Sequence, residues 1–478
     1  MERNDPRYQA YVEILKEELI PAMGCTEPIA LAYAAAKARE VLGVLPDSVQ
    51  LQVSGSIIKN VKSVIVPNTG HLKGMEAAVA AGIIAGSAEK ELEVISEVSE
   101  EKKSAIRDYL QTVPITTEHT EQGHVFDIVV TERCGQDYAR VRIADYHTNI
   151  CRIEKNGTVL YEVPLLDETV QEDARADRSL LNMQDIWDFA ETADLRDVAD
   201  LLERQIRYNN AIAEEGLLGD YGANIGRVLL TTYGNDVSNR AKAKAAAGSD
   251  ARMNGCELPV IINSGSGNQG ITCSVPLIEY AKELHSGKEK LYRALIISNL
   301  VAIHEKTGIG TLSAYCGAVS AGAGAGAGIV YLCGDGYQAA IHTVVNALAI
   351  VSGIVCDGAK ASCAAKIASS VDAALLGYNM YKCHQVLKFD VKAHSVKTDT
   401  GSWESLYVQV NVWHGLDKWD GMLLKGDAVT VFARELKTRE YNGKTYYSVD
   451  ADDIQPGGLV LFRWMQNLID LCTEPPAS

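Results

Sequence analysis

The chain has 478 residues, and at roughly 150 residues per domain this length predicts two or three domains. Its 47% hydrophobic and 22% charged residues are typical of a globular protein, and no stretch is long and apolar enough to span a bilayer. The 45 basic and 62 acidic residues give a net charge of −17, which argues against a nucleic-acid backbone as main partner and makes a small molecule the expected ligand.

Targeting and cysteine usage predict the compartment. The N-terminus lacks the apolar segment of a signal peptide, so we expect a cytoplasmic protein. The 11 cysteines are then expected to be free thiols or metal ligands, because the cytosol is reducing and an odd number cannot all pair within one chain.

The first 175 residues are predicted to form an α+β domain. Apolar residues recur at helical spacing on both sides of PAMGCTEP, which predicts two helices around a break within residues 7–42. Alternating polar and apolar residues predict strands over 49–66 and 112–163, with a hairpin turn at Asn156-Gly157.

Residues 176–382 are predicted to form a second domain that is nearly all helical, because strand-like alternation disappears and helical spacing takes over. Within it, AGAGAGAGIVYL alternates glycine and alanine, although each glycine inside a helix costs about 0.5–1 kcal/mol relative to alanine. The segment therefore predicts a buried helix that neighbouring elements approach closely.

Beyond residue 382 the alternation returns, and four of the five tryptophans lie after residue 400. Short strands separated by turns predict a small β domain over 383–478, closed by a short helix. Residues 386–456 resemble the oligonucleotide-binding (OB) barrel of single-stranded-DNA-binding proteins, which stack bases on aromatic residues such as Trp413 or Tyr447. This resemblance leaves two alternatives. The barrel binds single-stranded nucleic acid, or it serves only for contacts or self-association.

A glycine-rich loop, GSGNQG at residues 265–270, formally matches the dinucleotide-binding fingerprint. The repeated βαβ units that such a site needs are missing around it. We expect instead a loop that binds a carboxylate through backbone N–H groups at a helix start, with a plain connection between helices as the alternative.

Three cysteines of the helical domain could hold a cluster. Cys316, Cys356 and Cys363 are separated by 40 and 7 residues, without the tight C-x₂-C pairs of zinc sites. Three thiolates can hold an iron–sulfur cluster and leave one iron open to substrate as a Lewis acid. From spacing alone, buried and inert cysteines remain the alternative.

Five motifs together resemble the L-cysteine desulfidase family, which is related to the iron–sulfur L-serine dehydratases. They are GCTEP (24–28), SGSIIKNVKSVIVPNTG (54–70), SGSGNQG (264–270), the segment around Cys316, and GIVCDGAKASC (353–363). The resemblance covers residues 1–382, and the chain departs from the family beyond them. It implies an enzyme that converts L-cysteine to pyruvate, ammonia and hydrogen sulfide with a [4Fe–4S] cluster and no pyridoxal phosphate.

The same resemblance assigns roles to individual residues. The cluster ligands fall on Cys316, Cys356 and Cys363, and the base that removes the Cα proton falls on Cys25. Since Cys25 precedes a predicted helix, we expect a lowered thiol pKa. The remaining assignments concern the substrate's carboxylate and ammonium, which would be held by Asn68, Ser266, Asn268 and Gln269.

Two other functions remain open at this point. An L-serine dehydratase would eliminate water with the same apparatus, and an inactive fusion would act as a binding protein through its C-terminal domain. We also expect a homo-oligomer without membrane contact.

Overall fold

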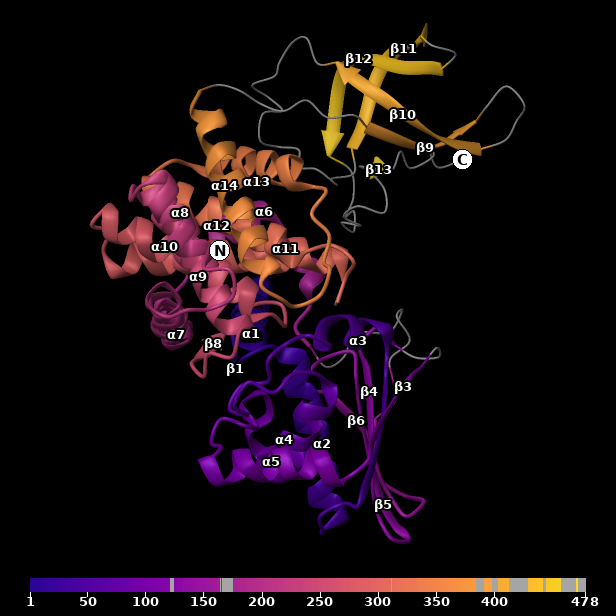
Figure 1. The fold of residues 1–478 in the computed structure, drawn as a ribbon. Coiled ribbons are helices and arrows are strands. Elements are labelled where there is room, and N and C mark those ends of the chain that lie inside the picture. Colours follow the sequence, from indigo (N-terminus) through magenta and orange to yellow (C-terminus); the bar gives the residue numbers. More distant parts are fainter. Residues whose placement is uncertain are drawn as a thin grey trace.

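The fold is described from a computed structural model, which covers residues 1–383 except 121–123, 164, 166–174 and 311, and beyond them the backbone of five strands. These residues form an N-terminal part with a sheet, a helical part, and a C-terminal sheet (Figure 1). The mixture agrees with the predicted α+β class. Among the helices that the structure describes, none has the length and apolar character needed to cross a bilayer.

The N-terminal part is a six-stranded sheet in the order β3-β2-β4-β5-β6-β7, in which only β2 and β3 run parallel. Helix α2 packs on β4 and β5, and α4 packs on α2. The strands are β2 (Ser48–Val53), β3 (Ile115–His119), β4 (Asp127–Cys134), β5 (Asp137–Ala144), β6 (Ile150–Lys155) and β7 (Thr158–Glu162). The helices are α1 (Pro6–Glu18), α2 (Thr26–Leu42), α3 (Gly55–Val61), α4 (Met75–Ala85) and α5 (Glu100–Thr112), with a 3₁₀ helix η1 (Ala88–Glu93).

Two local predictions can be compared here. The hairpin at Asn156-Gly157 joins β6 and β7, and both residues have the positive φ that a tight hairpin turn requires. The strand predicted over 49–66 was wrong beyond Val53, because Gly55–Val61 forms α3. A short apolar run such as SIIKNV has no periodicity that separates a strand from one or two helical turns.

The helical part surrounds helix α12, as the glycine–alanine pattern predicts. A Cβ added at Gly324 would lie 2.4 Å from a backbone oxygen of α11, and one at Gly322 would lie 2.8 Å from the backbone of α14. Glycine is therefore required where these helices touch. The helices are α6 (Met183–Thr192), α7 (Ala199–Leu218), α8 (Ile225–Tyr233), α9 (Val237–Met253), α10 (Gly267–Glu283), α11 (Lys288–Ile309), α12 (Gly317–Cys333), α13 (Tyr337–Val351) and α14 (Ser362–Lys382), with 3₁₀ turns η2 (Arg178–Leu180) and η3 (Leu195–Asp197).

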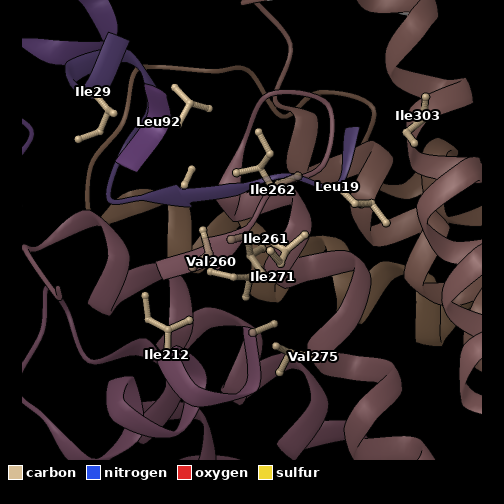
Figure 2. Packing of buried hydrophobic residues seen from close by; sticks show 14 of the residues in the cluster. Leu19, Ile29, Leu92, Ile212, Val260, Ile261, Ile262, Ile271, Val275 and Ile303 are labelled. Atoms are coloured by element: carbon tan, nitrogen blue, oxygen red, sulfur yellow. The ribbon is translucent and has the colours of Figure 1, made fainter. Parts of the chain in front are cut away.

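A two-stranded antiparallel ribbon joins the N-terminal and helical parts. It pairs β1 (Pro21–Met23) with β8 (Pro259–Ile261), and the Ile262 amide donates to the Ile20 carbonyl at 3.0 Å. Val260 and Ile261 of β8 are buried in a core that also contains Leu19 and Ile271 (Figure 2). The segment after β1 meets the glycine-rich loop after β8, because the Thr26 hydroxyl donates to the Gly265 carbonyl at 3.0 Å.

The first helix also belongs to this junction. Tyr8 and Tyr11 of α1 pack edge-on against Phe189 of α6, with ring centroids 5.2 and 5.3 Å apart. The Tyr11 hydroxyl donates to the Leu180 carbonyl at 2.8 Å. The boundary predicted at residue 175 therefore separates segments that share one core.

The C-terminal strands agree with the predicted β character of this region. They are β9 (Val391–Lys397), β10 (Trp403–Asn411), β11 (Val429–Tyr441), β12 (Lys444–Pro456) and β13 (Asp470–Leu471), in the order β11-β12-β10-β9-β13. Of the predicted final helix only Asp470–Leu471 are described, and they form strand β13, so the helix was wrong at these two residues. The rest of that segment, Trp413 and the side chain of Tyr447 lie outside the described residues. Barrel closure and nucleic-acid binding therefore stay predictions.

Candidate active site

One cavity lies between the N-terminal and helical parts, beside the β1–β8 ribbon. From the N-terminal part it is lined by Cys25, Glu27, Asn60 and His147. From the helical part come Arg252, the loop of residues 264–269, Lys306, Cys316, Cys356 and Cys363, among others. Of the eight residues predicted for the site, the structure thus brings seven to one cavity.

Four helices begin at this cavity. Cys25 is the N-cap of α2, Ser266 that of α10 and Cys316 that of α12, and Cys363 lies in the first turn of α14. None of these three N-caps uses its side chain to bond the backbone N–H groups of the first turn. Since a helix start carries partial positive charge, these four helix starts attract anions such as thiolates and carboxylates, and burial of the thiols acts in the opposite direction.

The cysteine-bearing segments are held together by their backbones. Tyr315 and Val355 form an antiparallel bridge, the Cys356 amide donates to the Ala314 carbonyl at 2.7 Å, and the Cys316 amide donates to the Ile354 carbonyl at 3.3 Å. Burial raises the pKa of Cys316 to about 11 and also raises the pKa of Cys363. In the metal-free protein these two side chains are therefore protonated, and metal binding would release their protons.

The donor set suits an iron–sulfur cluster better than a single ion. All three cysteines are free thiols on one cavity. In the described part of the chain, no three His, Cys, Asp or Glu side chains are grouped closely enough to hold one metal ion. A [4Fe–4S] cluster places each thiolate on a different iron, so its ligands can stand further apart than those of one ion. As free thiols on one cavity wall, Cys316, Cys356 and Cys363 have the donor chemistry that this cluster requires.

A lysine adds positive charge next to these thiols. Lys306, in the last turn of α11, lines the same cavity and bonds to the Gly310 carbonyl. Burial lowers its pKa to about 8, although nearby Cys356 and Cys316 act in the opposite direction. Its charge would favour thiolates at this end of the cavity.

Cys25 lies in the cavity wall with only 2% of its surface exposed, and its Sγ donates to Glu27 Oε2 at 3.0 Å. The expected lowering of its thiol pKa was wrong. Burial raises the pKa of Cys25 well above its ordinary value, and the charge of Glu27 raises it further. Desolvation and a neighbouring carboxylate outweigh the helix start.

Four buried polar atoms in the cavity wall have no hydrogen-bond partner among the described residues. They are Asn60 Oδ1, His147 Nε2, Arg252 Nε and Gln269 Oε1. Such atoms cost free energy unless something pairs with them, so they indicate a polar ligand in this space. A cation, two amide oxygens and an imidazole can satisfy both the carboxylate and the ammonium of an amino acid.

The glycine-rich loop allows these side chains to approach. A Cβ at Gly267 would lie 2.2 Å from Arg252 Nε, and one at Gly265 would lie 3.1 Å from the His147 ring. Arg252 also donates from Nη1 to Asn268 Oδ1 at 3.2 Å. Ser266 and Asn268 line the cavity beside Gln269, and their contacts with substrate stay a prediction.

Asn68 is the predicted residue that the structure does not bring to this cavity. Its Nδ2 donates to the Ile95 carbonyl at 2.8 Å, which ties the 67–70 turn to the segment after η1. Its surroundings form a separate, more open cavity of about 450 Å³ that also includes His71, Glu215 and Cys256. The observed contacts give Asn68 a role in holding its own loop.

Sequence reasoning missed Glu27, His147 and Arg252. Glu27 belongs to the GCTEP motif, so the motif itself could have indicated it. His147 lies in the turn between β5 and β6, and Arg252 lies near the end of α9, both outside the recognised motifs. Only the packing of the two parts brings these side chains together.

Comparisons with known proteins bear on the family of this chain. The family model described as serine dehydratase alpha chain matches residues 89–400. A UPF0597 protein of Desulfitobacterium hafniense is 62% identical over 382 residues, which cover 80% of this chain and 88% of that protein. UPF0597 proteins of Lachnoclostridium phytofermentans and Treponema denticola are 55% and 47% identical, covering 77% and 80% of this chain and 88% and 89% of their own lengths.

Proposed function

The chain belongs to the serine dehydratase alpha chain family, and from this premise we propose that it is an iron–sulfur lyase that eliminates sulfide from L-cysteine, giving pyruvate, ammonia and hydrogen sulfide. The observation that carries the proposal is the cavity, which combines four cysteines with four polar atoms that lack partners among the described residues. The motif resemblance to L-cysteine desulfidases favours sulfide over water as leaving group.

The polar groups fit an α-amino acid. The Arg252 guanidinium would take the substrate carboxylate, since its fork of donors matches two carboxylate oxygens. Asn60 Oδ1 and Gln269 Oε1 would accept hydrogen bonds from the ammonium group. These contacts would fix Cα and its proton relative to Cys25.

Elimination requires a base for the weakly acidic Cα proton and help for the departing sulfur. Cys25 would act as the base. A [4Fe–4S] cluster held by Cys316, Cys356 and Cys363 would supply a Lewis acid at its open iron. The aminoacrylate that leaves the cavity then tautomerises and hydrolyses to pyruvate and ammonia.

The first test removes a cluster ligand. Anaerobically purified protein should be brown, contain about four iron per chain, and form pyruvate and sulfide from L-cysteine. Cys356→Ala should lose at least half of the iron and nearly all activity, whereas Cys134→Ala, at the end of β4 and outside the cavity wall, should lose neither. Colourless, iron-free wild-type protein with full activity would contradict the proposal.

An L-serine dehydratase is the second candidate, favoured by the family description. Both reactions need the same base and Lewis acid, and they differ only in the leaving group. Values of kcat/KM for L-cysteine and L-serine, measured on one anaerobic preparation, decide between them. A larger value for L-serine would replace the desulfidase proposal, and no turnover of either would favour a binding protein.

A further inference from the structure

Resting on the proposed function, we infer that Glu27 accepts the proton of Cys25, so that the two side chains together form the base. Cys25 Sγ and Glu27 Oε2 are 3.0 Å apart, in a wall where the two residues are 2% and 8% exposed. Glu27 acts through Cys25 and is a positioning residue in this scheme.

The carboxylate is held in place from a second element. Asn60 of α3 donates from Nδ2 to Glu27 Oε1 at 2.9 Å, which leaves Oε2 directed at Cys25. The start of α2 is tied to the glycine-rich loop as well, because the Thr26 hydroxyl donates to the Gly265 carbonyl at 3.0 Å. The geometry of the pair is therefore fixed before substrate enters.

The electrostatics explain why Cys25 needs a partner. Burial keeps the Cys25 thiol protonated near neutral pH, and a protonated thiol cannot take a proton from Cα. For Glu27, burial opposes ionisation, but His147, the Cys25 S–H group and Arg252 outweigh it and lower the pKa of this carboxyl. A carboxylate thus lies beside a thiol that has to lose its proton.

The proton steps balance without another reactant. The S–H bond of Cys25 breaks as an O–H bond forms on Glu27. The thiolate electron pair then takes the Cα proton, the Cα–H pair forms the Cα=Cβ bond, and the sulfur leaves with the Cβ–S pair. The two side chains now hold one proton more than at the start, and transfer of this proton to the leaving hydrosulfide gives hydrogen sulfide and restores the pair.

The test compares Glu27→Gln, Glu27→Asp and wild type as iron-loaded holoenzymes. Gln keeps the size and one accepting oxygen but cannot take the proton. We expect kcat for L-cysteine to fall about 100-fold or more, the contribution of general base catalysis, with KM within about threefold and iron unchanged. Glu27→Asp should recover part of kcat. The control is Glu40→Gln, exposed near the end of the same helix, which should match wild type.

A second readout does not depend on turnover. Alkylation of Cys25 by iodoacetamide, followed by mass spectrometry, should depend less steeply on pH between 6 and 8 in wild type than in Glu27→Gln, because part of the reactive thiolate then arises by proton transfer within the pair, which is independent of pH. In Glu27→Gln the rate should rise about tenfold per pH unit, as for an isolated thiol. The other charged groups that act on the pair are His147, whose pKa burial lowers, and Arg252, so neither should change charge over most of this interval. Lys306 lines the same cavity and burial lowers its pKa to about 8, but its titration is common to wild type and Glu27→Gln and does not distinguish them.

Three outcomes would overturn the inference. They are a kcat for Glu27→Gln within threefold of wild type, loss of iron together with kcat, and equal pH dependence of alkylation in wild type and Glu27→Gln. If wild type turns over neither L-cysteine nor L-serine, the proposed function fails, and the alkylation profiles alone then decide whether Glu27 accepts the proton.

Discussion

Arg252 is the residue on which substrate recognition would depend most. It is 2% exposed, and its Nε has no partner among the described residues. A buried cation is costly unless an anion or several acceptors compensate it, and Asn268 Oδ1 supplies one acceptor. A substrate carboxylate would complete this compensation, which ties the affinity for amino acids to this side chain.

Arg252→Lys tests this role. Lysine keeps the charge but loses the planar fork, so we expect KM for L-cysteine to rise about tenfold or more, with kcat less affected and iron content unchanged. Steady-state kinetics on the anaerobic enzyme measure this. Arg196→Lys, on a side chain that is 85% exposed, is the control. An unchanged KM would show that Arg252 does not hold the carboxylate.

At the scale of elements, the site depends on how the glycine-rich loop enters α10. Asn263 and Ser266 exchange backbone hydrogen bonds of 3.1 and 3.0 Å, and Ser264 and Gly265 between them both have positive φ. This tight turn directs the start of α10 into the cavity and brings Gly267 into close contact with the Arg252 side chain. The backbone conformation of this turn thus determines where the Arg252 guanidinium lies.

Gly267→Ala should therefore have the same effect on substrate binding as a substitution of Arg252. The added Cβ would lie 2.2 Å from Arg252 Nε, so the side chain must move, and we expect KM for L-cysteine to rise about tenfold while iron is retained. Gly287→Ala is the matched control, since Gly287 also lies at the start of a long helix, as its N-cap, and its Cβ would meet nothing within 4 Å. Kinetic constants equal to wild type in both variants would contradict this account of the loop.

At the scale of the whole molecule, stability should depend on a buried acid far from the site. Glu132 of β4 is completely buried, and neither of its carboxylate oxygens has a hydrogen-bond partner among the described residues. Burial raises the pKa of Glu132 well above its ordinary value, although Arg39 acts in the opposite direction. Glu132 therefore keeps its proton in the folded state over a pH range in which the unfolded chain has lost it. The free energy of unfolding should fall as pH rises from the ordinary pKa of a glutamate toward the higher pKa of folded Glu132.

Glu132→Gln removes this titration. We expect the variant to gain about 1–3 kcal/mol in the free energy of unfolding at pH 8, because its amide is neutral in the folded state without binding a proton, with a smaller gain at pH 5. Thermal melts at both pH values measure the difference. Glu89→Gln, an exposed position in η1, should change neither. A gain that is independent of pH would show that Glu132 does not titrate over this range.

Parts of this architecture could be predicted from sequence because they depend on local signals. The close packing around α12 follows from its glycines, and the hairpin at Asn156-Gly157 follows from its turn residues. The meeting of Arg252 and His147 could not be predicted, because the β1–β8 ribbon that aligns the two parts is only three residues long on each side. Asn68 looked equivalent to the other polar motif residues, yet its amide is used to bond Ile95.

The bridge between Tyr315 and Val355 has a consequence for how the chain would respond to loss of a cluster. Its hydrogen bonds, and those of Cys316 and Cys356, run between backbone groups, so this frame does not need anything bound to the thiols in order to exist. Small zinc domains behave differently, since their ligands come together only with the metal. If this frame holds the proposed cluster, loss of iron and sulfide by oxidation would leave these backbone hydrogen bonds in place, and the same chain could take up a new cluster.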